Sequence, residues 1–462
     1  MAKAAMKDVI VLLPGITGSV LQKDGKDVWA VSGGAAMNAL RGLGESLDDL
    51  KLTDDSPDLD DLGDGISAPR IMPDISLIPG FWKIDGYGKV GRTIQDSFDV
   101  TPGLNYFEFA YDWRRDNRAA AHRLARDSHD WLQRWREHSG NDDARLILIA
   151  HSMGGLISRY FTEVLGGWAD TRFLVTIGTP YRGSLNAVSF LVEGMKKKLG
   201  PITLMDLSDL LRSFTSVYQL LPIYPCIDVG GAELARVTEV PDLAGIDETK
   251  AMAAFDFHHA ISDAVEANQQ DPAYNERGYQ ILPLVGIFQP TTQSARLDGN
   301  DIEFLKSYRG EDHGGDGTVP RVSATPLELS NKNREVYLKE RHASLQNTDP
   351  ALAHLAGVLT TQSIDQSLFF DAGAGLSLDV EDAYMADDYI PVRVLPEVEW
   401  AELTARVEDT ATQETVATQS LEVQADGWHE AVLEPLPAGT YRLTVAADGV
   451  APVTDLIAVF ET

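Results

Sequence analysis

The stretch from Leu146 to Phe161, LILIAHSMGGLISRYF, joins a short apolar run to an amphipathic one. The first part is rich in aliphatic and β-branched residues and predicts a buried strand, and the second has apolar residues at helical spacing. Between them stands Ser152, which follows His151 and precedes small residues. A strand, a sharp turn that carries a serine, and a helix form the layout of a nucleophile elbow. The stretch therefore predicts both an α/β fold and a reactive serine.

The tight turn of an elbow requires small residues on both sides of the serine. Gly154 meets this requirement on one side. On the other side, the usual glycine is replaced by Ala150, the next smallest residue. We therefore expect the turn to form with modest strain. The alternative is a chance serine at the end of a core strand.

A serine hydroxyl is a weak nucleophile and needs a base, itself oriented by an acid, to activate it. In α/β-hydrolases these partners follow in the order Ser, then Asp or Glu, then His. Asp316 on the glycine-rich loop HGGDGTVP and His342 beyond the strand-like run EVYLK have this order. Both stand on loops after predicted strands. We predict that Ser152, Asp316 and His342 form a catalytic triad.

Four neighbouring residues are weaker candidates for the triad. Asp312 and His313 lie on the same loop as the predicted acid but precede its glycine pair. His354 falls inside a predicted helix, where a structural or surface histidine is expected. His151 is adjacent to the serine, and adjacent residues at an elbow point in different directions. We expect His151 to pack or to hydrogen-bond locally.

Two backbone N–H groups are needed to stabilise the negative oxygen of a tetrahedral intermediate. One belongs to the residue after the nucleophile, which is Met153. The other comes from a loop after an early strand, where LLPGITGS offers Ile16 and where Gly15 allows the turn. Pro-Gly marks any turn, so this assignment depends on all the parts occurring together in order. Such chemistry requires no cofactor and no metal ion.

The wider pattern predicts an α/β-hydrolase fold in residues 1–372. Strand-like and helix-like runs alternate there, as in a mostly parallel sheet with helices on both faces. Two segments, at about 24–90 and 186–278, interrupt the alternation, and insertions of this length indicate a cap. In residues 373–462 apolar and polar residues alternate between Pro, Gly and Asp turns. This pattern predicts an all-β, immunoglobulin-like sandwich as an accessory domain.

The charge of the chain excludes one class of partner. Its 462 residues include 39 Lys and Arg against 70 Asp and Glu, for a formal net charge of -31. Phosphate binding needs a basic face, so we expect no nucleic-acid partner. The acidic run LTDDSPDLDDLGDG is interpreted as a solvated loop rather than a calcium site, because it lacks EF-hand spacing. The lysines of FLVEGMKKKLGPITL are interpreted first as a solvated helix end and second as a lipid-docking patch.

The single cysteine and the short apolar runs indicate the compartment. Cys226 has no partner for an internal disulfide, and we interpret it as a buried, inert thiol. No apolar run approaches the roughly 20 residues of a transmembrane helix. The N-terminal MAKAAMKDVIVLLPG has too short an apolar part for a signal peptide. The expected location is the cytoplasm.

Taken together, six motifs resemble the lecithin:cholesterol acyltransferase family of α/β-hydrolases, which includes lysosomal phospholipase A2-like enzymes. They are VIVLLPGITGSVLQ, FEFAYDWRRD, IAHSMGGL, VTIGTPYRGS, SVYQLLP and GGDGTVP. The resemblance runs from about residue 9 to the region of His342 and does not cover the C-terminal segment. It implies an acyl hydrolase or acyltransferase that acts on lipid esters through a serine acyl-enzyme, and it supports the triad and the two N–H donors. Trp113 and Tyr181, which stand in two of the motifs, are candidate substrate contacts. Bracing of the site is the other interpretation of Trp113.

Three functions stay open from the sequence. The leading one is a serine acyl hydrolase of lipid esters, with phospholipids among the candidate substrates. The second passes the acyl group to an alcohol acceptor. The third is a small-ester carboxylesterase whose sandwich domain binds a glycan or a protein, although that domain would also serve by packing on the catalytic one. Transient contact with a membrane or a glycan is a candidate interaction under these hypotheses.

Overall fold

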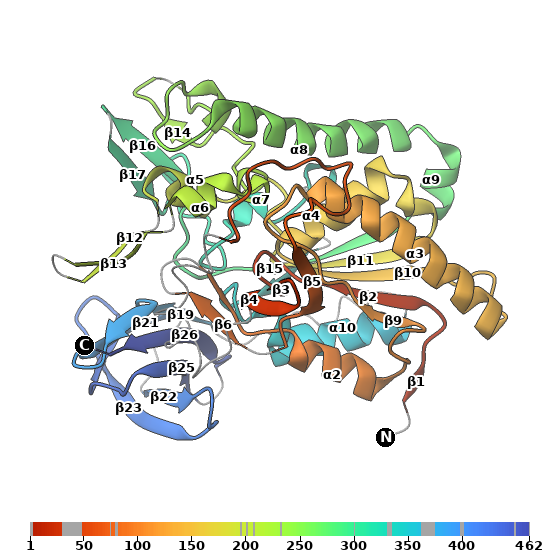
Figure 1. Cartoon of the computed structure of the whole chain (residues 1–462). Helices are drawn as coiled ribbons and strands as arrows, with labels where there is room; N and C mark the ends of the chain where they lie inside the picture. Colours follow the sequence, from red (N-terminus) through yellow and green to blue (C-terminus); the bar gives the residue numbers. More distant parts are fainter. Residues whose placement is uncertain are drawn as a thin grey trace.

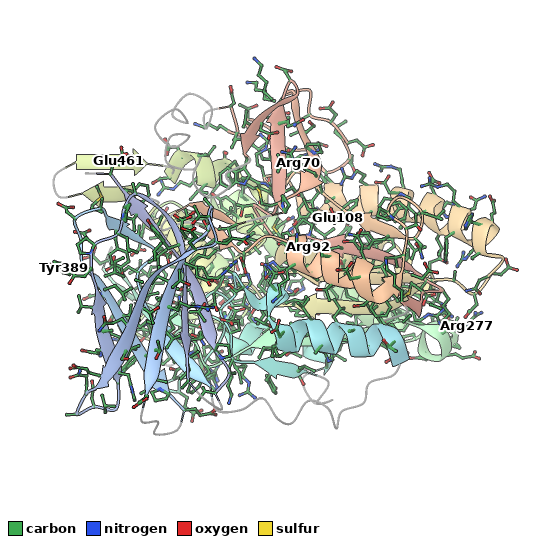
Figure 2. The ribbon with its side chains drawn as sticks, turned by 90° about the horizontal axis from the view of Figure 1, so that it is seen from below. Arg70, Arg92, Glu108, Arg277, Tyr389 and Glu461 are labelled. Atoms are coloured by element: carbon green, nitrogen blue, oxygen red, sulfur yellow. The ribbon has the colours of Figure 1, made fainter. Side chains whose placement is uncertain are left out.

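A larger α/β part and a smaller C-terminal β domain lie side by side in the computed structural model of the chain (Figure 1). Figure 2 shows Tyr389 and Glu461 on the β domain and Arg277 at the far end of the α/β part. The structure describes residues 3–29, 49–73, 75–78, 82–194, 196–199, 202–206, 208–231, 233–299, 301–329, 335–361, 375–397, 402–447 and 450–461.

A parallel sheet of six strands forms the centre of the α/β part. In spatial order the strands are β18 (Val336–Leu338), β15 (Gln280–Gly286), β11 (Thr171–Ile177), β10 (Leu146–His151), β2 (Val9–Leu13) and β9 (Tyr106–Glu108). Every neighbouring pair is parallel. Parallel strands need crossover connections, and helices supply most of them here. The predicted α/β-hydrolase type of sheet is confirmed.

Both faces of this sheet are covered by helices (Figure 1). On one face lie α3 (Asn117–Ser139), α4 (Met153–Arg159) and α8 (Glu248–Asn268), and on the other lie α2 (Gly88–Ser97) and α10 (Asp349–Thr361). Strand β2 is apolar throughout because each of its two faces packs into a core. Val9 and Val11 join the core beneath α3, whereas Ile10 and Leu12 join the core beneath α2 and α10. None of the described helices combines the length and the apolarity needed to span a membrane.

The two predicted insertions contain strands and helices of their own. The first insertion holds β4 (Lys26–Trp29) and β5 (Ile66–Ile71), both paired with β3 (Ser19–Lys23), and the hairpin of β6 (Ser76–Ile78) and β7 (Trp82–Ile84). The second holds α5 (Leu185–Val192), β12 (Lys196–Leu199), β13 (Ile202–Asp206), α6 (Ser208–Ser213), α7 (Thr215–Tyr218), β14 (Ile227–Asp228), α8 and α9 (Pro272–Arg277). Further strands are β1 (Ala4–Ala5), β8 (Phe98–Asp99), β16 (Ser294–Asp298) and β17 (Asp301–Leu305).

The lysines at positions 196–198 lie on strand β12, which forms a hairpin with β13. The expectation that they end a helix was therefore wrong. Helix α5 stops before them, and Gly194, with φ 67°, takes the chain out of the helical conformation.

Arginines of the YDWRRD motif hold the acidic run of the first insertion against the fold. Arg115 Nε lies 3.2 Å from Asp55 Oδ1, and the Arg115 guanidinium donates to three backbone carbonyls of the run. Arg114 Nη2 lies 2.9 Å from Asp64 Oδ2. The interpretation of the run as a solvated loop was wrong for Asp55, whose side chain is buried, whereas Asp64 is partly exposed. Among the residues described, no group of three or more His, Cys, Asp or Glu is placed to hold a metal ion.

The described residues of the C-terminal β domain form eight strands. Their spatial order is β19 (Leu376–Asp379), β21 (Ile390–Pro396), β24 (His429–Leu433), β23 (Thr415–Val423), β22 (Leu403–Asp409), β25 (Gly439–Ala446), β26 (Val453–Phe460) and β20 (Ala383–Met385). All neighbouring pairs are antiparallel except β20 and β26. The predicted antiparallel C-terminal domain is confirmed. The expected boundary between residues 372 and 373 lies outside the described residues and stays a prediction.

Candidate active site

Ser152 stands at the sharp turn between β10 and α4, so the expected strand, turn and helix are present. Its backbone has φ 52° and ψ −123°, a conformation that residues other than glycine rarely adopt. Two hydrogen bonds hold the turn. The Ser152 N–H donates to the Ile177 carbonyl at 2.9 Å, and Thr179 Oγ1 donates to the Ser152 carbonyl at 3.0 Å.

Small residues let this turn approach the loop after β2. A Cβ atom on Gly154 would lie 2.5 Å from the carbonyl oxygen of Pro14, so only glycine fits there without a shift. Ala150 is fully buried in β10, opposite Leu13 on one side and Thr176 on the other. The sheet therefore accommodates a methyl group at the position where a glycine is usual.

His342 lies between the serine and an aspartate. Its Nε2 is 3.0 Å from Ser152 Oγ, and its Nδ1 is 2.7 Å from Asp316 Oδ2. One tautomer satisfies both contacts, with Nδ1–H donating to the carboxylate and the serine hydroxyl donating to Nε2. All three residues are buried. The fold thus brings together the three residues that were singled out in the sequence.

Asp316 is fixed by its own loop. Its second carboxylate oxygen, Oδ1, accepts hydrogen bonds from the N–H groups of Thr318 at 2.9 Å and Val319 at 2.6 Å. The N–H of His342 donates to the Asp316 carbonyl at 2.8 Å. Gly178 has φ 59°, and a Cβ atom there would lie 3.0 Å from His342 Nδ1. The acid and the base are therefore oriented relative to each other by the surrounding backbone.

The two predicted oxyanion donors stand at turn positions beside the serine. Met153 is the first residue of α4, where a backbone N–H has no helical acceptor. Ile16 follows Gly15 in a β-turn that is closed by the Gly18 N–H donating to the Gly15 carbonyl at 3.1 Å. A Cβ atom on Gly15 would lie 2.8 Å from Ser152 Cβ. The loop of Ile16 therefore passes directly beside the serine.

Tyr87 and His151 connect the loop of Gly15 to the loop of His342. The Gly15 N–H donates to the Tyr87 hydroxyl at 2.7 Å, and that hydroxyl is 2.9 Å from His151 Nδ1. His151 Nε2 is 3.2 Å from the carbonyl oxygen of His342. Burial, followed by the neighbouring His342, lowers the pKa of His151 well below its usual value. A neutral ring therefore accepts from the tyrosine and donates to the carbonyl.

The sequence did not reveal this connection. We expected His151 to pack or hydrogen-bond locally, yet its ring contacts residues 64 and 191 positions away. No local pattern marks Tyr87, which precedes helix α2 and lies in a different part of the chain.

Trp113 and Tyr181, the two candidate substrate contacts, do not line the cavity that lies next to His342. Trp113 is fully buried, and its Nε1–H donates to the Ser19 carbonyl at 3.1 Å. Tyr181 is buried as well, with its hydroxyl 2.7 Å from Thr176 Oγ1. This burial favours a bracing role for both residues. Substrate contact by either one stays a prediction.

The other candidates from the sequence are engaged elsewhere. Asp312 Oδ1 accepts from Gln293 Nε2 at 2.5 Å and from the Gly314 N–H at 2.8 Å. His354 lies inside α10, where burial lowers its pKa to about 4. Cys226 is fully buried, and burial raises the pKa of its thiol, as befits an inert cysteine.

A cavity of about 270 Å³ lies next to His342. Its walls come from the loops of Asp316 and His342, from α5, and from a charged pair that the sequence did not reveal. In that pair Lys83 Nζ is 2.7 Å from Asp382 Oδ1. Asp382 belongs to the C-terminal β domain, so this domain contributes to the surroundings of the site.

A parallel sheet with a buried serine, histidine and aspartate at the carboxyl ends of its strands defines an α/β-hydrolase. The chain belongs to the lecithin:cholesterol acyltransferase family, whose family model matches residues 97–350. This membership identifies it as a lipid-acting acyl hydrolase or acyltransferase. A comparison with curated proteins gives no significant match.

Several solved structures resemble the chain weakly. The mature form of the Bacillus licheniformis lipase BlEst2 has 13% identity and a TM-score of 0.36, over 77% of this chain and 93% of that one. Its propeptide form has 13% identity and a TM-score of 0.35, over 97% and 73%. Phospholipase PlaB from Legionella pneumophila has 9% identity and a TM-score of 0.24, over 98% and 92%. Similarity this weak does not bear on function.

Proposed function

We propose that the chain is a serine acyl hydrolase that cleaves lipid acyl esters through an acyl-enzyme on Ser152. The observation that carries the proposal is the position of His342, 3.0 Å from Ser152 Oγ and 2.7 Å from Asp316 Oδ2. Ser152 Oγ attacks the ester carbonyl carbon while His342 Nε2 takes the hydroxyl proton. Asp316 stabilises the imidazolium that forms.

The N–H groups of Ile16 and Met153 stabilise the negative oxygen of the tetrahedral intermediate. The intermediate collapses as the bond to the leaving alcohol breaks, and that alcohol takes the proton from His342. The acyl group is then bonded to Ser152 Oγ. A water molecule then attacks the acyl carbon while His342 Nε2 takes one of its protons. The bond from the acyl carbon to Ser152 Oγ breaks, His342 returns the proton to Ser152 Oγ, and the free acid leaves.

The cavity beside His342 favours a substrate with a polar leaving alcohol. His342 protonates the leaving oxygen, so the alcohol part of the ester lies on its side of the site. There the lining includes Lys83, Arg341 and Asp382. A glycerophospholipid, whose alcohol part is polar and charged, matches this lining better than an apolar sterol ester.

Substitution of the nucleophile tests the proposal. Ser152→Ala should lower the turnover of p-nitrophenyl esters and of a phospholipid by at least about 10⁴-fold, as loss of a catalytic serine does elsewhere. Ser158→Ala is a matched control, because Ser158 is a buried serine of α4 whose hydroxyl donates to the Gly154 carbonyl at 2.8 Å. Turnover by Ser152→Ala at the level of this control would show that another group carries the reaction.

The same acyl-enzyme can react with an alcohol in place of water, and the family match supports transfer as well as hydrolysis. Incubation with a phospholipid labelled in its acyl chain, alone and with added alcohols, separates the two. We expect labelled free acid in every case. A labelled ester of an added alcohol as the main product would make transfer the principal activity.

A further inference from the structure

The loop that carries His342 is bonded to the C-terminal β domain. Glu340 is buried, and its Oε1 accepts a hydrogen bond from the Thr454 N–H of β26 at 3.1 Å. The neighbouring Lys339 pairs with the carboxylate of Glu397, which follows β21. Two consecutive residues just before the base therefore have partners in the C-terminal domain.

Arg341, directly before His342, binds the most deeply buried charge of the interface. Its Nη1 lies 2.7 Å from Asp455 Oδ2, and its guanidinium also donates to the Leu378 carbonyl of β19. Asp455 is fully buried, and its Oδ1 lies 2.5 Å from Lys83 Nζ. One carboxylate of β26 thus neutralises two cations of the α/β part. A buried pair of this kind fixes the direction of its side chains, because a lost partner leaves an uncompensated charge.

The loop of Asp316 is tied to the same domain through Gln289. The Gln289 side chain donates to the Leu376 carbonyl at 3.0 Å and accepts from the Leu378 N–H at 3.2 Å. Its own N–H donates to the carbonyl of Gly315, directly before Asp316, at 2.9 Å. Strand β19 is therefore bonded to the segments beside both the acid and the base.

We propose that the C-terminal β domain is a positioning element of the catalytic centre, in which Asp455 holds Arg341 and thereby orients His342. The inference rests on the proposed function, because it assigns the domain a role in that reaction. Several of the bonds that cross the interface end on residues 339–341 and on Gln289, and others end on Lys83 and Asp85. A domain that served only to capture a glycan or a particulate substrate would not need them. Hydrolysis of small soluble esters should therefore depend on this domain.

Asp455→Asn tests the proposal in the full chain. It keeps the shape of the side chain and removes the charge that pairs with Lys83 and Arg341. We expect kcat for p-nitrophenyl acetate to fall at least 10-fold and KM to change less than 2-fold, because the base is displaced and the acyl site is not. Arg393→Gln is the control, since it removes a pair with Glu430, Nε to Oε1 2.7 Å, inside the same domain. Wild-type kcat in a folded Asp455→Asn protein would overturn the proposal.

Hydrogen–deuterium exchange gives a readout that does not depend on activity. Peptides covering residues 335–345 should exchange faster in Asp455→Asn than in the wild type or in Arg393→Gln. If the wild type cleaves no ester, the proposed function fails, and the exchange still decides whether Asp455 holds the loop. If Asp455→Asn does not fold, Arg341→Gln breaks the same contact from the other side and should give the same loss of kcat and the same faster exchange. Unchanged exchange in residues 335–345 would overturn the proposal in either variant.

Discussion

Replacing Glu340 by glutamine should change how the stability of the protein depends on pH. Glu340 is buried between the loop of His342 and the C-terminal β domain. Burial raises its pKa to about 8, although the Arg341 and Thr454 N–H groups act in the opposite direction. Both of these bonds end on Oε1, at 2.8 Å and 3.1 Å. The amide oxygen of glutamine accepts the same two bonds, so Glu340→Gln removes only the ionisable group.

The sign of the effect follows from proton linkage. The folded-state pKa of Glu340, about 8, lies above the unfolded value of 4.5, so between these values the folded state binds more protons. Stability contributed by the protonated group is complete below the lower value and is lost as the pH rises through the higher one. One pKa unit corresponds to about 1.4 kcal/mol, so the loss between pH 5 and pH 8 is about 3 to 4 kcal/mol. The variant lacks this loss and should gain on the wild type by that amount.

Urea unfolding of both proteins at pH 5, 6, 7 and 8 measures the difference in free energy of unfolding. The control Glu422→Gln removes a carboxylate from an exposed position of β23. The advantage of Glu340→Gln over the wild type should grow steadily with pH. A difference that stays constant within about 1 kcal/mol from pH 5 to pH 8 would refute the raised pKa.

Three further changes test contacts around the site. Gly15→Ala places a Cβ atom 2.8 Å from the Cβ of the nucleophile, so ester hydrolysis should fall at least about 100-fold. Gly357→Ala is the control, because a Cβ atom added there meets no atom within 4 Å outside its own helix, and equal activity of the two variants would refute the crowding. Tyr87→Phe removes the hydroxyl between two loops, and kcat should fall about 10-fold at constant KM; an unchanged kcat argues against the connection. Arg115→Met breaks the contacts that hold the acidic run and should lower the free energy of unfolding by about 3 kcal/mol. The midpoint of urea unfolding measures this loss, and an unshifted midpoint would show that the run docks without these contacts.

The sequence was sufficient to predict the central sheet and the proximity of Ser152, Asp316 and His342, because local strand, turn and loop patterns mark each of these parts. The apolar residues 146–151 are typical of a buried parallel strand. Gly140, with φ 67°, ends the helix that precedes this strand.

His342 follows β18 of this sheet, and the carboxyl ends of parallel strands meet at one edge. Asp316 comes after β17, a strand of a separate sheet, and reaches the same edge through a bridge to Gln289, which lies just beyond β15. The order Ser, Asp, His along the chain predicted the proximity of these residues, but not the strands between β15 and Asp316.

Contacts between distant segments could not be predicted in this way. Glu340 and Thr454 are 114 positions apart, and neither stands in a distinctive motif. No local pattern links the acidic run to its partner Arg115, which lies 60 positions beyond Asp55. The lysines at 196–198 suit a helix end as well as a strand, and the pairing of β12 with β13 is not visible in the local sequence.

The most direct test of the central claim, that His342 activates Ser152 as a nucleophile, is covalent labelling with a fluorophosphonate. An activated serine hydroxyl attacks the phosphorus, forms a P–O bond and displaces fluoride. Peptide mass spectrometry of the labelled wild type should place the modification on Ser152, and His342→Ala should abolish it. Labelling at another residue, or equal labelling of Ser152 after His342→Ala, would contradict the assignment.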